Sequence, residues 1–260
     1  MSQGGFETQK SNADLETYLR LKRLADILYD VQDVRIRTEN RLRIFPEKTR
    51  TTHADPLKKM EHDIDKEILS LLNQIPIWKQ WLSKVKGIGP RLGSGLIANI
   101  TVNFKPESQS SRETQMQFAL KTKNEETLIP VLRGIAAFEN ISKLWAYCGM
   151  HVIEGKAPKR KRGELSNWNS KMRTLCWKIG ESFVKQNDGK YRAIYDASRQ
   201  KYDARSELYE GKGNKGHRYA MAKRRTVKLF LADLWLEWRK IEGLSITQPY
   251  SHRFDKPIAC

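Results

Sequence analysis

The fold that we expect depends on one stretch, Val85-Lys86-Gly87-Ile88-Gly89-Pro90, which separates two apolar segments. Glycines at alternate positions permit a tight turn with positive φ. Pro90 suits the first position of a helix, where the backbone N–H has no partner within the helix. Ile88 lies between the glycines and can anchor the turn in the core. The stretch predicts a helix-hairpin-helix, in which one helix ends at Val85 and the next begins at Pro90.

The same turn is a candidate anion site. Its N–H groups, and those at the N-terminus of the following helix, suit a phosphate oxygen. Positive side chains on both sides of the turn can add charge-assisted hydrogen bonds. The alternative is a plain helix corner, in which Gly93 and Gly95 serve only close helix packing. The contacts expected here are Lys86, Gly87, Ile88, Gly89, Pro90 and Arg91.

Two long helices are expected before this turn. Residues 14–44 contain no Pro or Gly and are rich in helix formers. After a polar loop, Asp55 as N-cap and Pro56 at the first helical position predict the start of a second helix. Together they predict a long antiparallel helical hairpin or coiled coil over residues 13–76. Its apolar stripes either pack within the chain or form a homodimer, and the sequence leaves both open.

The rest of the chain is typical of short helices. The Ser- and Gln-rich stretch 103–112 is expected to be a loop, and no segment shows the alternation of a strand. The prediction is an all-α fold, in which the helical hairpin is followed by a helix-hairpin-helix multi-helix domain. The four expected parts are a disordered tail (1–12), the hairpin (13–76), the helix-hairpin-helix domain (77–244) and an irregular tail (245–260). Helices are expected in this domain at 78–85, 90–99, 112–122, 125–133, 139–147, 167–186, 190–209 and 217–241.

The charge of the chain indicates its class of partner. Among 260 residues, 48 Lys and Arg stand against 30 Asp and Glu, a net charge of +18. Such an excess attracts polyanions, so nucleic acid or an anionic membrane surface is the expected partner. The sequence has no run of 18 apolar residues and no secretory signal, so we expect no bilayer-spanning segment and a soluble, cytoplasmic protein, or a nuclear one in a eukaryote. Between the two polyanions, the glycine turn favours nucleic acid, and we expect no membrane partner.

Cysteine and histidine usage gives no metal or disulfide pattern. Cys148, Cys176 and Cys260 are far apart in sequence and form no Cys-x-x-Cys motif. Their odd number argues against a disulfide framework and a zinc site. The five histidines lack ligand spacing. We therefore expect no metal and no cofactor.

Two basic segments extend the predicted phosphate contacts. The first occupies the loop 149–164 and the helix after it, and the second, Lys212–Lys228, contains no acid. Trp177 is expected to pack in the core, whereas Trp168 either stacks on bases or packs. A charge run is often only a solvated face, but two runs beside the glycine turn favour a continuous phosphate track. The expected contacts are Lys156, Lys159, Arg160, Lys161, Arg162, Lys171, Arg173, His217, Arg218, Lys223, Arg224 and Arg225.

The order of motifs resembles one known family. Over about residues 20–240, the chain resembles the coiled-coil and C-terminal region of the insertion-sequence transposases of the bridge-RNA-guided, RuvC-plus-serine class. This resemblance implies a DNA-handling body. The motifs are Arg37-x-x-Asn40-Arg41-Leu42, the glycine turn, Phe138-Glu139-Asn140-x-x-Lys143-Leu144-x-x-Tyr147-x-Gly149-Met150, Trp168-Asn169-x-x-Met172-Arg173 and Gly216-His217.

The chain departs from this family where the chemistry would be. The family carries a preceding RuvC-like domain with four acidic metal ligands, and this sequence contains no such domain. Its nucleophilic serine precedes a glycine, whereas the equivalent pair here is Glu154-Gly155. Ser166 and Ser170 lie nearby, but neither precedes a glycine. About thirty extra residues also separate Ile100 from Phe138. We therefore expect no catalytic residue.

These observations favour a DNA-binding protein that contacts phosphates without sequence dependence and is not an enzyme on its own. One alternative is an active transposase or recombinase that completes its site with another chain. Another is a scaffold for structured RNA, since the resembled family uses a guide RNA. Double-stranded DNA is the expected partner, and structured RNA stays open.

Overall fold

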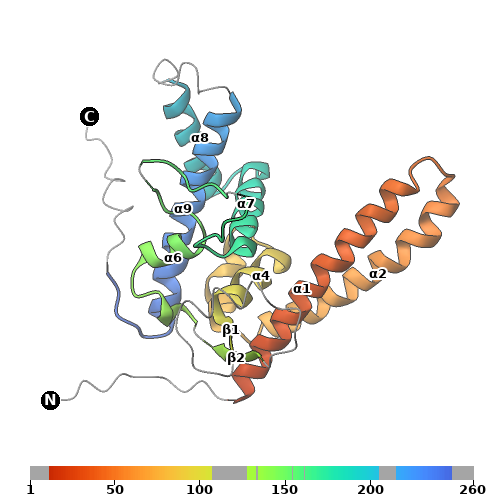
Figure 1. Cartoon of the computed structure of the whole chain (residues 1–260), viewed down its shortest axis with the longest axis horizontal. Helices are drawn as coiled ribbons and strands as arrows, with labels where there is room; N and C mark the ends of the chain where they lie inside the picture. The colour runs from red at the N-terminus through yellow and green to blue at the C-terminus, as the bar shows by residue number, and fades with distance from the viewer. Residues whose placement is uncertain are drawn as a thin grey trace. The chain divides into compact units, whose positions relative to one another are not determined.

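The computed structural model describes residues 12–106, 128–132, 134–153, 155–160, 162–204 and 215–247. In this part of the chain the fold is all-α, as predicted, with the addition of one two-stranded antiparallel ribbon (Figure 1). The helices are α1 (Asn12–Arg41), α2 (Glu47–Leu72), α3 (Pro76–Gln80), α4 (Pro90–Thr101), α6 (Ile141–Tyr147), α7 (Ser170–Lys185), α8 (Lys190–Asp203) and α9 (Lys215–Ile241). Short 3-10 helices are η1 (Leu82–Lys84) and η2 (Ile135–Ala137), and the strands are β1 (Val102–Pro106) and β2 (Leu128–Leu132).

The chain forms two compact units. Unit 1 spans residues 1–71 and 97–134, and unit 2 spans residues 72–96 and 135–260. This division differs from the expected single boundary at residue 76, because β1 packs with α1 and β2 pairs with β1. The expected tails, 1–12 and 245–260, lie mostly outside the described residues.

In unit 1, α1 and α2 lie side by side and run in opposite directions (Figure 1). Their buried stripe includes Leu21, Leu28 and Ile68, which are at most 1% exposed. Midway along the pair, Arg35 Nε donates to Glu61 Oε1 at 2.5 Å, and Glu61 is 4% exposed. The polar positions in the seam are therefore matched across the two helices.

The predicted start of α2 at Asp55 is wrong. The helix begins at Glu47, and Pro56 lies inside it. Proline removes one helical hydrogen bond, but Ala54, two turns into the helix, is 2% exposed and packs in the core. Tertiary packing of the first two turns thus outweighs the local start signal.

The ribbon corrects two further predictions within the described residues: residues 103–106 of the loop expected at 103–112 are strand, and so are residues 128–132 of the helix expected at 125–133. The rest of both ranges lies outside the described residues. Strands β1 and β2 pair antiparallel, with Val102 opposite Leu132 and Phe104 opposite Pro130. A short apolar run does not by itself distinguish a strand from a helix. Pro130, within β2, is unfavourable in a helix interior but compatible with an edge strand. The expected helix at 112–122 lies outside the described residues.

In unit 2, α9 is the central helix and packs against α6, α7 and α8. Phe230 of α9 contacts Phe183 of α7, with ring centroids 5.2 Å apart, and Tyr191 of α8 at 5.3 Å. The buried carboxylate of Asp233 accepts hydrogen bonds of 2.7 Å from Tyr191 Oη and Lys190 Nζ. These contacts join α7, α8 and α9 into one core.

The expected helices of unit 2 mostly appear, with shifted ends. The segment 78–85 is α3 and η1 rather than one helix, and 139–147 is shortened to α6. Helix α8 ends at Asp203, and the remainder of its expected range is mostly outside the described residues. None of the helices that the structure describes combines the length and apolarity needed to cross a membrane.

Candidate functional site

The candidate site begins at the N-terminus of α7. Asn169 is the N-cap, and its Oδ1 accepts a hydrogen bond of 3.0 Å from the backbone N–H of Met172. Its Nδ2 donates to Tyr147 Oη at 2.7 Å, and its backbone N–H donates to the Tyr147 carbonyl at 2.9 Å. Asn169 thereby fixes the end of α6 to the start of α7 and sets the position of Trp168.

Trp168 packs closely against the chain after α6. Gly149 has φ +66°, and a Cβ there would lie 3.0 Å from two atoms of the Trp168 ring. Only glycine combines this backbone conformation with so close an approach. The guanidinium of Arg173 stacks on the ring of Trp168, 4.8 Å from the ring centroid. The residues of the Tyr147–Gly149 and Trp168–Arg173 motifs therefore build one wall.

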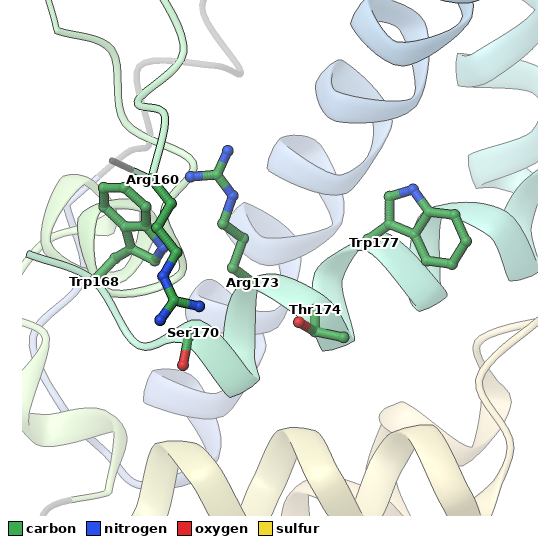
Figure 2. Close-up of a pocket in the computed structure, with 6 residues that line it drawn as sticks. All are labelled: Arg160, Trp168, Ser170, Arg173, Thr174 and Trp177. Carbon is green, nitrogen blue, oxygen red and sulfur yellow. The ribbon is translucent and has the colours of Figure 1, made fainter. Parts of the chain in front are cut away.

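This wall borders a surface pocket of about 450 Å³ (Figure 2). Figure 2 shows Trp168 and Trp177 at opposite ends of the pocket, with Ser170 and Thr174 on α7 between them. Two of the six lining residues are arginines and none is a carboxylate. They are Arg160, Trp168, Ser170, Arg173, Thr174 and Trp177.

Trp177 forms the opposite end and is 57% exposed, so the prediction that it packs in the core is wrong. The ammonium of Lys223 lies 4.5 Å from the ring centroid of Trp177. Lys223 also forms an ion pair with Glu181 and is 7% exposed. Lys223 therefore supports the indole from inside the protein and is not a phosphate contact, which corrects its predicted role.

Behind the pocket lies a cluster of crowded cations. Arg224 donates to the carbonyl of His151 at 2.7 Å, so this predicted contact instead supports the loop after α6. Burial, and then repulsion from Arg173, lowers the pKa of Arg224. Burial likewise lowers the pKa of Arg173 and, with repulsion from Arg224, that of Lys228. The cluster favours an anion because its positive charges are partly desolvated.

His151 belongs to the same cluster, although no motif in the sequence distinguishes it from the other four histidines. Its ring lies 6.2 Å from that of Trp168. Both ring nitrogens are buried, and no hydrogen-bond partner for them exists in the described part of the chain. Burial, followed by the charges of Arg224 and Arg173, lowers the pKa of His151. The protonated imidazole is therefore disfavoured at this position.

The glycine turn packs against the same helix, α7. Gly87 has φ +95°, and its carbonyl accepts a hydrogen bond of 2.6 Å from Ser182 Oγ. Ile88 is 5% exposed, so its side chain anchors the turn, as expected, and is not itself a contact. A Cβ on Gly89 would meet nothing within 4 Å, and Pro90 begins α4. The turn thus packs against α7 at the half-buried Gly87 and is open to solvent at Gly89.

Two other predicted phosphate contacts form ion pairs with carboxylates of the chain. Lys86 forms an ion pair with Asp188, and Arg218 pairs with Asp203. The Lys86 pair is solvent-exposed, and such pairs exchange readily for a phosphate. Arg218 is held more firmly, because its side chain is only 15% exposed.

The remaining predicted contacts are distributed over the surface of unit 2. Arg91 and Arg225 are half-buried, and Lys161 lies outside the described residues. Glu154, at the position of the resembled family's serine, also lies outside them. Exposed members of the predicted set are Lys156, Lys159, Arg160, Arg162, Lys171 and His217.

Two cysteines are buried next to one another. Cys148, at the end of α6, and Cys176, on α7, are both free thiols with 0% exposure. Burial, followed by a hydrogen bond that the Cys148 thiol donates to Cys176, raises the pKa of Cys148 well above its ordinary value. Among the residues described, no three His, Cys, Asp or Glu side chains gather as metal ligands would.

Comparison with known proteins leaves the transposase resemblance as a prediction. No protein-family model matches the chain, and neither does any curated protein. The functional conclusion therefore depends on the site itself.

Proposed function

We propose that this chain binds nucleic acid, mainly duplex DNA, through contacts to phosphates that do not depend on the base sequence. The observation that carries this proposal is the pocket on α7, in which Arg160 and Arg173 lie between two tryptophans with no carboxylate among the lining residues. Arginine is the side chain best suited to phosphate, because its planar fork presents two parallel donors. The net charge of +18 supports the same class of partner.

The glycine turn supplies a second phosphate contact. Gly89 is open to solvent and precedes the N-terminus of α4, where backbone N–H groups lack helical acceptors. Because Gly87 is fixed to α7 through Ser182, the turn and the pocket belong to one rigid support. Exposed lysines and arginines of the loop after α6 extend the track.

Duplex binding is tested by fluorescence anisotropy with a labelled 20-base-pair DNA of arbitrary sequence. Replacing Arg160 by Ala and Arg173 by Leu together is expected to weaken binding to every duplex sequence alike. Lys240→Ala is the matched control, because it also removes an exposed cation from unit 2, at the far end of α9. Equal losses in both variants, or no binding by the wild-type protein, would remove the pocket from the interface.

A second candidate function is strand cleavage, and one observation favours it. Ser170 lines the same pocket as Arg160 and Arg173, so the site offers a hydroxyl as well as positive charge. Phosphoryl transfer needs such a nucleophile together with positive charge that stabilises the transition state. A cleavage assay on candidate element ends, with metal and with or without a RuvC-like partner chain, tests it. Loss of cleavage in Ser170→Ala would support this function, and absence of cleavage in all conditions would reject it.

Structured RNA is the remaining alternative partner. The same arginines and aromatic rings contact RNA phosphates and bases equally well. Nucleic acid that copurifies with the protein is treated with DNase and RNase in separate samples. Loss of the material to RNase alone would move the proposal from DNA to RNA.

A further inference from the structure

We infer that the pocket on α7 takes a single unstacked nucleotide, whose base stacks on Trp177 while its phosphate is bound by Arg160 and Arg173. This inference rests on the proposed function and specifies the form of nucleic acid that its site recognises. It concerns one nucleotide, of DNA or of RNA, that is displaced from a helix or lies in a single strand.

The two faces of the Trp177 ring have different surroundings. Lys223 occupies one face, with its ammonium 4.5 Å from the ring centroid, and is itself held by Glu181. The indole is nevertheless 57% exposed, so its outer face is open. An indole with one face supported and the other open is a stacking surface for a base.

Trp168 has a different role at the other end of the pocket. It is half-buried, and the guanidinium of Arg173 already stacks on it at 4.8 Å. Trp168 therefore orients an arginine, and Trp177 is left as the base platform. A positively charged end and an aromatic end match the two parts of a nucleotide, its phosphate and its base.

The size and floor of the pocket fit one nucleotide. Its volume of about 450 Å³ is within the range of roughly 300–1,000 Å³ that small-ligand sites occupy. Ser170 and Thr174 are four residues apart on α7 and share one face of the helix, where their hydroxyls can bond to sugar or phosphate oxygens. No lining residue is an amide or a carboxylate, so stacking rather than base-edge recognition dominates.

A base inside a regular duplex cannot reach such a platform, because it is already stacked on its neighbours. Unstacking costs least at a bulge, a mismatch or a single strand. The pocket therefore predicts a preference for duplexes that carry an extrahelical nucleotide.

The test compares an intact duplex with the same duplex carrying one bulged 2-aminopurine, in DNA and in RNA versions. The wild-type protein is expected to bind the bulged form about tenfold more tightly than the intact form, which is typical of one base–aromatic stack. The 2-aminopurine emission is expected to be quenched on binding. The ratio of the affinity for the bulged duplex to that for the intact duplex is compared between the DNA and RNA versions. The version with the larger ratio identifies the nucleotide that the pocket prefers.

Variants at Trp177 make the test specific. Trp177→Ala is expected to bring the ratio of the two affinities close to one and to abolish the quenching, whereas Trp177→Phe keeps most of both. Leu165→Ala, another exposed apolar side chain of unit 2 outside the pocket lining, is the matched control and is expected to keep the wild-type ratio. Circular dichroism checks that each variant is folded.

The outcomes separate this inference from the proposed function. A wild-type protein that binds intact and bulged duplexes equally, or a Trp177→Ala variant that retains the preference, overturns the nucleotide pocket while duplex binding stands. A wild-type protein that binds none of these polynucleotides overturns both.

Discussion

The guanidinium of Arg173 stacks on the ring of Trp168, 4.8 Å from its centroid, and its Nη1 atom has no hydrogen-bond partner among the described residues. Arg173 is thus held in place by an aromatic ring and not by a carboxylate. Gly149 makes this arrangement possible, because a side chain there would collide with the Trp168 ring. Because Nη1 itself is buried, an anion in the pocket would be bound by the other donors and the unneutralised charge of this guanidinium.

Arg173 is therefore expected to contribute strongly to affinity for DNA. Loss of a charge-assisted hydrogen bond costs about 1.5–3 kcal/mol, so Arg173→Leu should weaken duplex binding by about tenfold or more. Arg173→Lys keeps the charge but loses the planar fork and the stacking, so its affinity should be intermediate. Anisotropy titrations with one duplex measure this order. If Arg173→Lys bound the duplex with the same affinity as the wild-type protein, only the positive charge would matter at this position.

The two glycines of the turn are expected to behave differently. At Gly87, φ +95° and a Cβ position 3.1 Å from Phe183 Cδ1 make alanine unfavourable. The left-handed conformation alone costs about 1–2 kcal/mol, so Gly87→Ala should lower the free energy of unfolding by at least this amount. Urea unfolding followed by circular dichroism measures the loss.

Gly89→Ala, in contrast to Gly87→Ala, is expected to affect DNA binding and not stability. A Cβ at Gly89 meets no atom of the chain within 4 Å, so the free energy of unfolding should change little. The added methyl group would stand where a phosphate approaches the turn, so duplex affinity should fall severalfold. If Gly89→Ala binds DNA like the wild type, the turn is a helix corner and not a contact.

Lys223 is expected to affect stability first. It is 7% exposed, forms an ion pair with Glu181 and packs over Gly180, where a Cβ would overlap its side chain. Removing one member of a buried pair costs about 3–5 kcal/mol, and partial exposure of Glu181 places Lys223→Ala near the lower end. The double variant Lys223→Met with Glu181→Gln should recover most of this stability in thermal unfolding. A Lys223→Ala protein with wild-type stability would contradict this description.

His151 gives unit 2 a specific pH dependence. Burial and the charges of Arg224 and Arg173 lower its pKa in the folded chain from the ordinary value of 6.5. The unfolded chain then binds a proton at a higher pH than the folded chain, so the free energy of unfolding decreases as the pH falls below about 6.5. In His151→Phe this decrease should be smaller. Urea unfolding of both proteins at about pH 7.5 and about pH 5.5 tests it, and parallel losses in both would exclude His151 as the cause.

Much of the fold could be predicted from sequence because several helices carry strong local signals. The Asn caps and apolar spacing of α6 and α7, and Pro90 at the start of α4, are features of the segment itself. The start of α2 could not be predicted, because burial of Ala54 against the hairpin outweighs the Asp55-Pro56 signal. The strands β1 and β2 pair across a long sequence separation, which periodicity does not reveal.

The candidate site was predicted only in part for a similar reason. Charge counts along the sequence identified Arg160 and Arg173, which do line the pocket. The same counts found no acid near Lys223, yet Glu181 reaches it from another helix. Trp177 was expected in the core, but Gly180 lets Lys223 approach, and Lys223 supports the indole at the surface. Local sequence reports which charges exist, and tertiary structure decides which of them are neutralised.

The salt dependence of duplex binding tests the central claim most directly. Each phosphate contact that is lost should reduce the slope of log affinity against log salt concentration by about 0.9. Arg160→Ala with Arg173→Leu should therefore bind more weakly and with a slope that is shallower by roughly two, whereas Lys240→Ala should keep the wild-type slope. A double variant with the wild-type affinity and slope would show that the pocket on α7 does not contact phosphates, and would contradict the account.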